Sequence, residues 1–237
     1  MDNKKLRLAV VFLFSAAMAW VEAACVIYLR TLLGRLEPYQ PHPLAMSPGS
    51  SLTRVEAFRE AATLIMLLSA GWLAGRSWRS RLAYAMIAFG VWDILYYGFL
   101  AVIGPWPRSA LDWDVLFLLP LPWWGPVLAP VAVSLVMILS GILISQFDQP
   151  ERPLWPRSWA QIAGLLGILL ALYVFMADAV HALASGGGEK AVGSLLPTQF
   201  NWPLFTIALV LMCMPMLDLG RQIWSQAHPA RPPGPPR

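Results

Sequence analysis

Apolar residues occur in six long runs along the chain, and shorter polar connections separate these runs. Each run has about 20 residues or more, which is the length that a helix needs to cross a hydrocarbon core of about 30 Å. The pattern therefore predicts an all-α polytopic membrane protein, with a six-helix transmembrane bundle within residues 1–226. The expected helices span residues 6–33, 53–75, 81–103, 127–146, 159–184 and 202–223.

The composition of the 237 residues agrees with this pattern. Hydrophobic residues make up 58% of the chain and charged residues 13%, whereas about a quarter of the residues in a soluble domain are charged. So few charges cannot cover a globule in water, and lipid is therefore the expected solvent for much of the chain. The formal net charge of +4 comes from basic residues spread over helix ends. This distribution suits membrane orientation and gives no basic groove for nucleic acid.

The first apolar run begins like a secretory signal peptide. Lys4, Lys5 and Arg7 precede it, and the small residues around Met18 resemble a cleavage site. However, the apolar stretch continues to Leu33, which is too long for the apolar part of a signal peptide. We expect an uncleaved helix.

Three other segments carry structural information. Residues 76–80 form a tight link, so the second and third helices are expected to be antiparallel neighbours. Residues 104–126 contain four tryptophans and five prolines, and their apolar middle part is too short to cross a membrane. We expect an interfacial or re-entrant segment there, across the outer mouth of the bundle. Residues 227–237 contain five prolines and should form a disordered cytoplasmic tail.

Lysine and arginine residues predict the orientation of the bundle. Eleven of the 17 fall at the N-terminus, in the connections 2–3 and 4–5, and in the tail, and six fall on the other side. Because cytoplasmic loops carry the excess of positive charge, both termini should be cytoplasmic. The expected location is the cell (inner) membrane.

Three carboxyl groups lie inside apolar runs, namely Glu22, Glu60 and Asp93. A charge at this depth is costly unless it is paired, protonated or hydrated, so it marks a candidate functional site. All three lie towards the outer side of the predicted bundle. A buried carboxyl can also simply join neighbouring helices, and for Glu22 alone this structural role is an equal alternative.

The short link between the second and third helices predicts which residues face each other. With the turn centred near Trp78, Glu60 should lie level with Tyr96, and Asp93 should lie level with Thr63. If both faces point inward, the acids share one polar patch, and Glu22 can join it from the first helix. The predicted patch consists of Glu22, Arg59, Glu60, Thr63, Asp93 and Tyr96 or Tyr97.

The charge of such a patch needs compensation. Dry, unpaired acids would be protonated near pH 7 and would act as neutral hydrogen-bond donors. If Arg59 reaches them, one or more can stay ionised. Three acids and one arginine cannot all be charged cheaply in a low dielectric, so a proton or a bound cation is expected unless water enters.

These features favour a membrane protein that binds, or performs acid–base chemistry on, an apolar or lipid-like ligand. Glu60, Asp93 and Glu22 would be the acid–base groups, and the aromatic segment 104–126 would act as a lid. Membrane lipids and an apolar small molecule are the expected partners. The expected ligand-binding residues are Arg59, Thr63, Tyr96, Tyr97, Trp123 and Trp124.

Two other functions remain open. A proton- or cation-coupled transporter or channel would use the same acids as ion sites, although the inner half offers almost no matching polar path. A non-catalytic membrane complex subunit or assembly factor would use the tryptophan-rich outer face to bind a partner.

Other sequence features give weaker indications of a site. Asp112 and Asp114 could clamp a divalent cation, but a solvated loop is the preferred interpretation. Asp218 is expected to pair with Arg221 one turn further along the helix. The histidines and cysteines show no metal-ligand spacing, so neither a metal nor a cofactor is expected.

Overall fold

The computed structural model describes residues 3–34, 37–39, 51–117, 121–186, 196 and 199–228, without the side chains of residues 52 and 53. Over this part of the chain, six helices are long and apolar enough to cross a membrane. They are α1 (Asn3–Leu32), α2 (Ser51–Ala74), α3 (Trp78–Ile103), α4 (Leu128–Phe147), α5 (Ser158–Ala184) and α7 (Trp202–Ala227). The predicted six-helix bundle is confirmed, and the predicted tail lies almost wholly outside the described residues.

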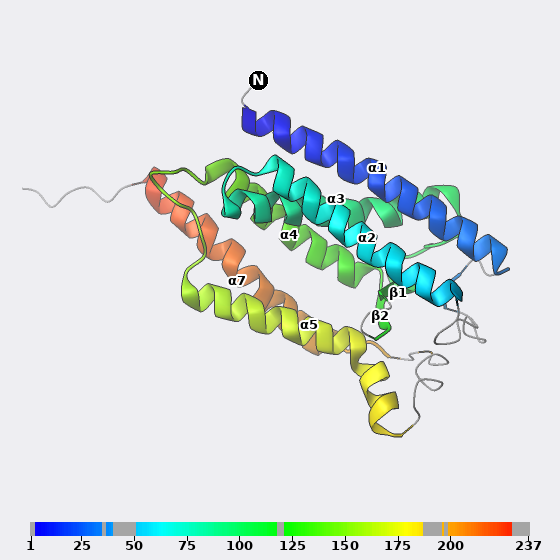
Figure 1. Ribbon diagram of the computed structural model, residues 1–237. Coiled ribbons are helices and arrows are strands. Elements are labelled where there is room, and N and C mark those ends of the chain that lie inside the picture. Colours follow the sequence, from blue (N-terminus) through cyan, green and yellow to red (C-terminus); the bar gives the residue numbers. More distant parts are fainter. Residues whose placement is uncertain are drawn as a thin grey trace, which may run out of the picture.

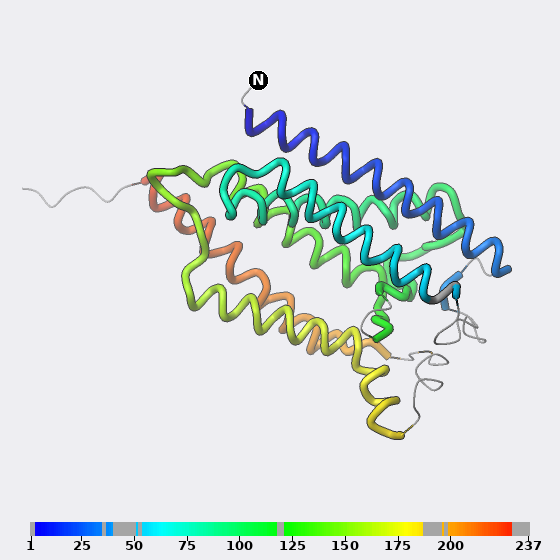
Figure 2. Tube along the Cα trace, viewed as in Figure 1, coloured from blue at the N-terminus to red at the C-terminus, as the bar shows by residue number. Residues whose placement is uncertain are grey.

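Helix α3 lies at the centre of the larger part of the bundle (Figure 1). It packs against α1, α2 and α4, while α5 packs against α7, and α7 joins this pair to α4. The expected contact between α2 and α3 is confirmed. Figure 2 shows the start of α1 at one end of the bundle. The end of α1, the start of α2 and the end of α3 lie at the other end.

Close contact between α3 and α4 depends on two glycines that face each other's helix. A Cβ atom added at Gly90 would lie 2.6 Å from the carbonyl oxygen of Ser134 on α4. A Cβ atom added at Gly141 of α4 would lie 2.6 Å from the carbonyl oxygen of Ala83 on α3. Small residues at these positions let the two backbones approach, as is common between helices in membranes.

The aromatic segment between α3 and α4 contains a two-stranded antiparallel hairpin, which the sequence pattern did not predict. Strand β1 (Trp113–Phe117) pairs with β2 (Trp123–Pro126), and Asp114 lies opposite Gly125. Strand β2 also contacts α4 and α5. The hairpin therefore lies at the end of the bundle where α3 ends and α4 begins (Figure 1).

Two local predictions are wrong. The second helix was expected to begin at residue 53, but α2 already begins at Ser51. Asp218 does not pair with Arg221 among the described contacts. Its carboxylate accepts hydrogen bonds from the backbone of Arg157 at 2.8 Å and from the side chain of Gln222 at 2.8 Å, because the connection before α5 folds back onto α7.

The contact between α3 and α4 gives a test of this packing. We predict that Gly90→Val lowers the stability of the purified protein by roughly 1–3 kcal/mol, because the added atoms overlap the α4 backbone. Thermal unfolding in detergent measures the change. Gly98→Val is the matched control, since nothing lies within 4 Å of a Cβ atom at Gly98 on the same helix. Equal unfolding temperatures for the two variants would contradict the packing described here.

Candidate functional site

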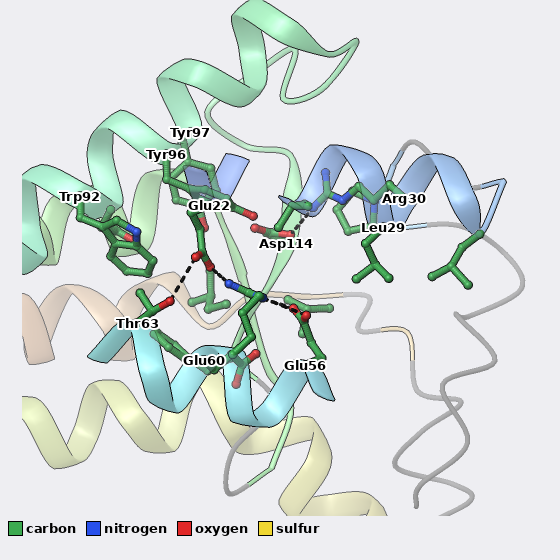
Figure 3. Close-up of a pocket in the computed structure, with 18 residues that line it drawn as sticks. Glu22, Leu29, Arg30, Glu56, Glu60, Thr63, Trp92, Tyr96, Tyr97 and Asp114 are labelled. Atoms are coloured by element: carbon green, nitrogen blue, oxygen red, sulfur yellow. Dashed lines mark hydrogen bonds and ion pairs between the residues drawn. The ribbon is translucent and has the colours of Figure 1, made fainter. Parts of the chain in front are cut away.

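A cavity of about 120 Å³ lies at the end of the bundle that carries the hairpin. Side chains of α1, α2, α3 and β1 line it (Figure 3). Two arginines, Arg30 and Arg59, contribute to the lining. Five carboxyl-bearing residues also line it: Glu22, Glu56, Glu60, Asp93 and Asp114.

Arg59 joins α1 to α2 at the centre of this site. Its Nε donates to Oε2 of Glu56 at 2.9 Å and its Nη2 to Oε1 of Glu56 at 2.5 Å, one turn earlier on the same helix. Its Nη1 donates to Glu22 of α1 (Figure 3). Thr63 Oγ1 donates to the other oxygen of Glu22 at 3.2 Å. Both oxygens of the Glu22 carboxylate are therefore held by α2.

Arg30 and Asp114 form a second ion pair, between α1 and the hairpin. Arg30 Nη2 lies 3.3 Å from Oδ1 of Asp114, and the guanidinium carbon lies 4.5 Å from the ring centre of Trp106. Asp114 is 2% exposed, so its placement in a solvated loop was wrong. The pairing with Arg30 brings its side chain into the cavity.

Burial changes the acidity of this carboxyl. Loss of hydration raises the pKa of Asp114 from an ordinary 3.8 to about 6, although the charge of Arg30 and a hydrogen bond with Tyr97 oppose the rise. Near neutral pH, Asp114 is therefore ionised and paired, and modest acidification protonates it.

Asp93 is a further carboxyl-bearing residue of the cavity lining. It is buried on α3, and its Oδ2 accepts a hydrogen bond of 2.8 Å from Ser134 Oγ of α4. Helix α4 carries no charged residue, and a lone serine in an apolar helix does not indicate a place in the site. Glu60 of α2 is also buried and lines the cavity.

Aromatic rings complete the wall beside Asp93. Trp92 and Tyr96 stack with ring centres 6.2 Å apart, and Tyr96 contacts Tyr97 at 5.1 Å. With Phe117 of β1, the lining therefore combines carboxyl groups, two guanidinium groups and four aromatic side chains.

The structure brings together most of the side chains that the sequence indicated. Seven of them line the one cavity: Glu22, Arg59, Glu60, Thr63, Asp93, Tyr96 and Tyr97. Trp123 and Trp124, also expected to bind ligand, are not among its lining residues. Trp123 stacks on Phe175 of α5 at 6.4 Å and Trp124 contacts Tyr39. Because adjacent strand residues point to opposite faces, the two tryptophans have separate surroundings.

Three charged residues of the cavity were assigned no role there from the sequence: Arg30, Glu56 and Asp114. Helical spacing gives no clear signal for Arg30, because eight residues after Glu22 is about 80° further around α1. Asp114 stands in the apolar stretch Trp113–Phe117, which is itself a sign of burial.

Among the described residues, no group of three or more histidine, cysteine, aspartate or glutamate side chains has an arrangement that could hold a metal ion. Five carboxyl groups and two arginines leave the cavity with more acidic than basic groups. Protons, water or a cationic ligand must offset this excess.

Comparison of the chain with protein-family models, with curated proteins and with solved structures gave no match.

The bridge made by Arg59 gives a first test of the site. We predict that Arg59→Gln destabilises the protein by about 1–3 kcal/mol, because it leaves the carboxylates of Glu22 and Glu56 without their charged partner. Thermal unfolding in detergent measures this effect. Arg54→Gln, at an exposed position of the same helix, should change the unfolding temperature much less. A similar small effect in both variants would show that the bridge contributes nothing.

Asp114 gives a second test, in its dependence on pH. The pKa of Asp114 is higher in the folded state than in the unfolded chain. Protonation of Asp114 therefore contributes fully to the free energy of unfolding below about pH 3.8, and this contribution is lost as the pH rises through about 6. We predict that infrared difference spectra show a carboxyl group becoming protonated as the pH falls through about 6. The Asp114→Asn variant should lack this signal. If the variant keeps it, another group is responsible.

Proposed function

We propose that this protein binds an amphiphilic, lipid-like molecule, with the polar end of the ligand in the carboxylate cavity and the apolar end between α1 and α2. The membrane would be the cell (inner) membrane, both termini would be cytoplasmic, and the cavity would open outwards. The observation that supports the proposal is an apolar groove that lies between the same two helices, further along their length from the cavity.

The groove has a volume of about 640 Å³ and lies between α1 and α2. Its walls are mostly aliphatic and aromatic, with Arg7 and Arg76 at the end far from the cavity. The lining residues are Leu6, Arg7, Val10, Val11, Phe14, Met66, Ser69, Ala70, Leu73, Ala74 and Arg76.

Helical spacing connects the groove to the cavity. On α2, Arg59, Thr63, Met66 and Ala70 follow one another at intervals of three or four residues, which is one face of a helix. The first two line the cavity and the last two line the groove. On α1, Phe14 of the groove lies two turns, or roughly 12 Å, before Glu22 of the cavity.

The packing of the bundle explains why the groove exists. Both α1 and α2 pack mainly on α3 and touch each other little. Their polar bridge through Arg59 is at one end, and at the other end Arg7 Nη1 donates to the carbonyl oxygen of Ala74 at 3.3 Å. Polar contacts therefore connect the two helices at two places, and apolar side chains line the space between these contacts.

The acids also suit chemistry on the polar end of such a ligand. Asp93 and Glu60 line the cavity from different helices, and Ser134 donates a hydrogen bond to Asp93. A pair of this kind can act as general acid and general base. Tyr96 would orient the substrate, and the hairpin would cover the cavity.

A proton- or cation-coupled carrier is the second candidate, and the excess of carboxyl groups favours it. Below the cavity, however, α1, α2 and α3 meet in an apolar cluster that contains Val11, Ala19, Leu67 and Ile87. A carrier would have to open this cluster to pass an ion. Binding of an amphiphile needs no such opening.

Mass spectrometry of molecules that co-purify with the protein tests the first function. We predict a retained amphiphile that is lost in Ala70→Phe, because the added ring fills the groove, and is also lost in Glu60→Gln and Asp93→Asn. The matched control is Leu68→Phe, which adds a ring on the same helix at an exposed position outside the groove.

An amphiphile retained equally by Ala70→Phe and by Leu68→Phe would contradict binding in the groove. Proton or cation flux in proteoliposomes, lost in Glu60→Gln and Asp93→Asn but unchanged in Ala70→Phe, would favour the carrier instead. Each variant is first compared with the unmodified chain for elution volume and unfolding temperature, so that loss of the fold is not taken for loss of binding.

A further inference from the structure

Two buried hydrogen-bond donors of the cavity have no acceptor among the described residues. They are the indole Nε1 of Trp92 on α3 and the guanidinium Nη1 of Arg30 on α1. Both side chains line the cavity, and the two residues are only 6% and 8% exposed. A buried donor without an acceptor costs free energy. The cavity therefore calls for acceptor atoms that the described part of the chain does not supply.

The indole of Trp92 is fixed beside the polar part of the cavity. Its ring stacks on Tyr96 with ring centres 6.2 Å apart. In Figure 3 its nitrogen lies on the side of the ring that faces Glu22 and Thr63. Both carboxylate oxygens of Glu22 already accept hydrogen bonds, one from Arg59 and one from Thr63. The nearest carboxylate is thus held by other donors, and the indole N–H is left for a ligand.

Arg30 also keeps donor capacity after its ion pair has formed. Its Nη2 donates to Oδ1 of Asp114 at 3.3 Å, and its guanidinium carbon lies 4.5 Å from the ring centre of Trp106. A guanidinium group has five N–H donors in a fixed plane, and neither contact supplies an oxygen to Nη1. An oxygen atom of a ligand would satisfy this donor without breaking the ion pair.

The charge of the lining decides between a neutral and an anionic acceptor. Both arginines of the cavity already pair with carboxylates, Arg59 with Glu22 and Glu56 and Arg30 with Asp114. Carboxyl-bearing residues also outnumber the arginines in the lining. An anionic head would add a negative charge among these carboxylates and would be repelled. An ammonium head carries only donors and would leave both buried N–H groups without an acceptor, whereas a neutral carbonyl group provides the acceptor and adds no charge.

We infer that the cavity recognises a neutral head with oxygen acceptors, as in an ester or a ketone, at the end of an apolar chain. This inference rests on the proposed function and names the class of its ligand. Trp92 Nε1 and Arg30 Nη1 donate to the oxygen atoms of the head, and the chain lies in the groove between α1 and α2. Protons and water, and not the ligand, then offset the excess of carboxyl groups.

Molecules with the same chain length and different heads test this inference without changing the protein. The full chain, stripped of lipid in detergent, is titrated with methyl palmitate, palmitate, hexadecylamine and hexadecane, and binding is followed by native mass spectrometry. We expect methyl palmitate to bind about tenfold more tightly than each of the other three. Methyl acetate, which has the same ester without the long chain, should not displace methyl palmitate at equal concentration.

Variants then connect the preference to the two donors. Trp92→Phe should lower the preference for methyl palmitate over hexadecane to about threefold, because one of the two donors is lost. Trp159→Phe, at an exposed position outside the cavity, should leave the preference unchanged. Arg30→Met combined with Asp114→Asn removes the second donor together with its ion pair and should act like Trp92→Phe.

An infrared signal distinguishes hydrogen bonding from a merely structural role of Trp92. The carbonyl stretch of methyl palmitate, isotope-labelled at the ester carbon, should lie at a lower frequency in the bound state than in detergent alone. Trp92→Phe should move this band back towards the position in detergent, and Trp159→Phe should not. A band that stays in place in Trp92→Phe would contradict donation by the indole.

The outcomes separate this inference from the proposed function. Palmitate or hexadecylamine binding at least as tightly as methyl palmitate, with Ala70→Phe weakening all of them, would overturn the neutral head and leave the amphiphile site standing. Methyl acetate displacing methyl palmitate at equal concentration would contradict the role of the groove. Absence of binding by every probe, with a protein that unfolds cooperatively, would overturn both.

Discussion

The ion bridge from Glu22 through Arg59 to Glu56 is the interaction on which the rest of the structure depends. It brings three charged side chains to the interface of two helices that otherwise make few contacts with each other. Buried charges persist only where their partners are held in place, and Thr63 and the packing of both helices on α3 supply this constraint. Where the bridge holds α1 to α2, a polar cavity forms beside it.

Two further polar contacts lie at the same end of the bundle. Arg30 ties the hairpin to α1 through Asp114, and Ser134 ties α4 to Asp93 of α3. Polar side chains that lipid could not solvate therefore join five elements at this end, namely α1, α2, α3, the hairpin and α4. The opposite end is fixed by different contacts, in which Lys4 and Arg79 bind the end of α4 at Asp148. Polar groups thus fix both ends, and apolar packing fills the middle.

The sequence predicts the helices well because length and apolar composition are local properties. It also predicts that Glu22, Glu60, Thr63 and Asp93 lie together, since the short link after α2 sets the register of α2 against α3. The hairpin was missed because its strands have only five and four residues, and it pairs residues separated by prolines. Arg30 and Ser134 enter the site through contacts between distant parts of the chain, which no local pattern contains.

Water access to the cavity is the most direct test of this account. In a variant with Cys25→Ala and Cys213→Ala, reconstituted into nanodiscs open to solvent on both sides, the small cationic reagent methanethiosulfonate ethylammonium is applied to Thr63→Cys and to Ile65→Cys. Thr63 lines the cavity, whereas Ile65 lies exposed on the outer surface of the same helix. We predict rapid modification of Thr63→Cys and little modification of Ile65→Cys. An unreactive Thr63→Cys, or equal rates for the two, would contradict a shared polar cavity.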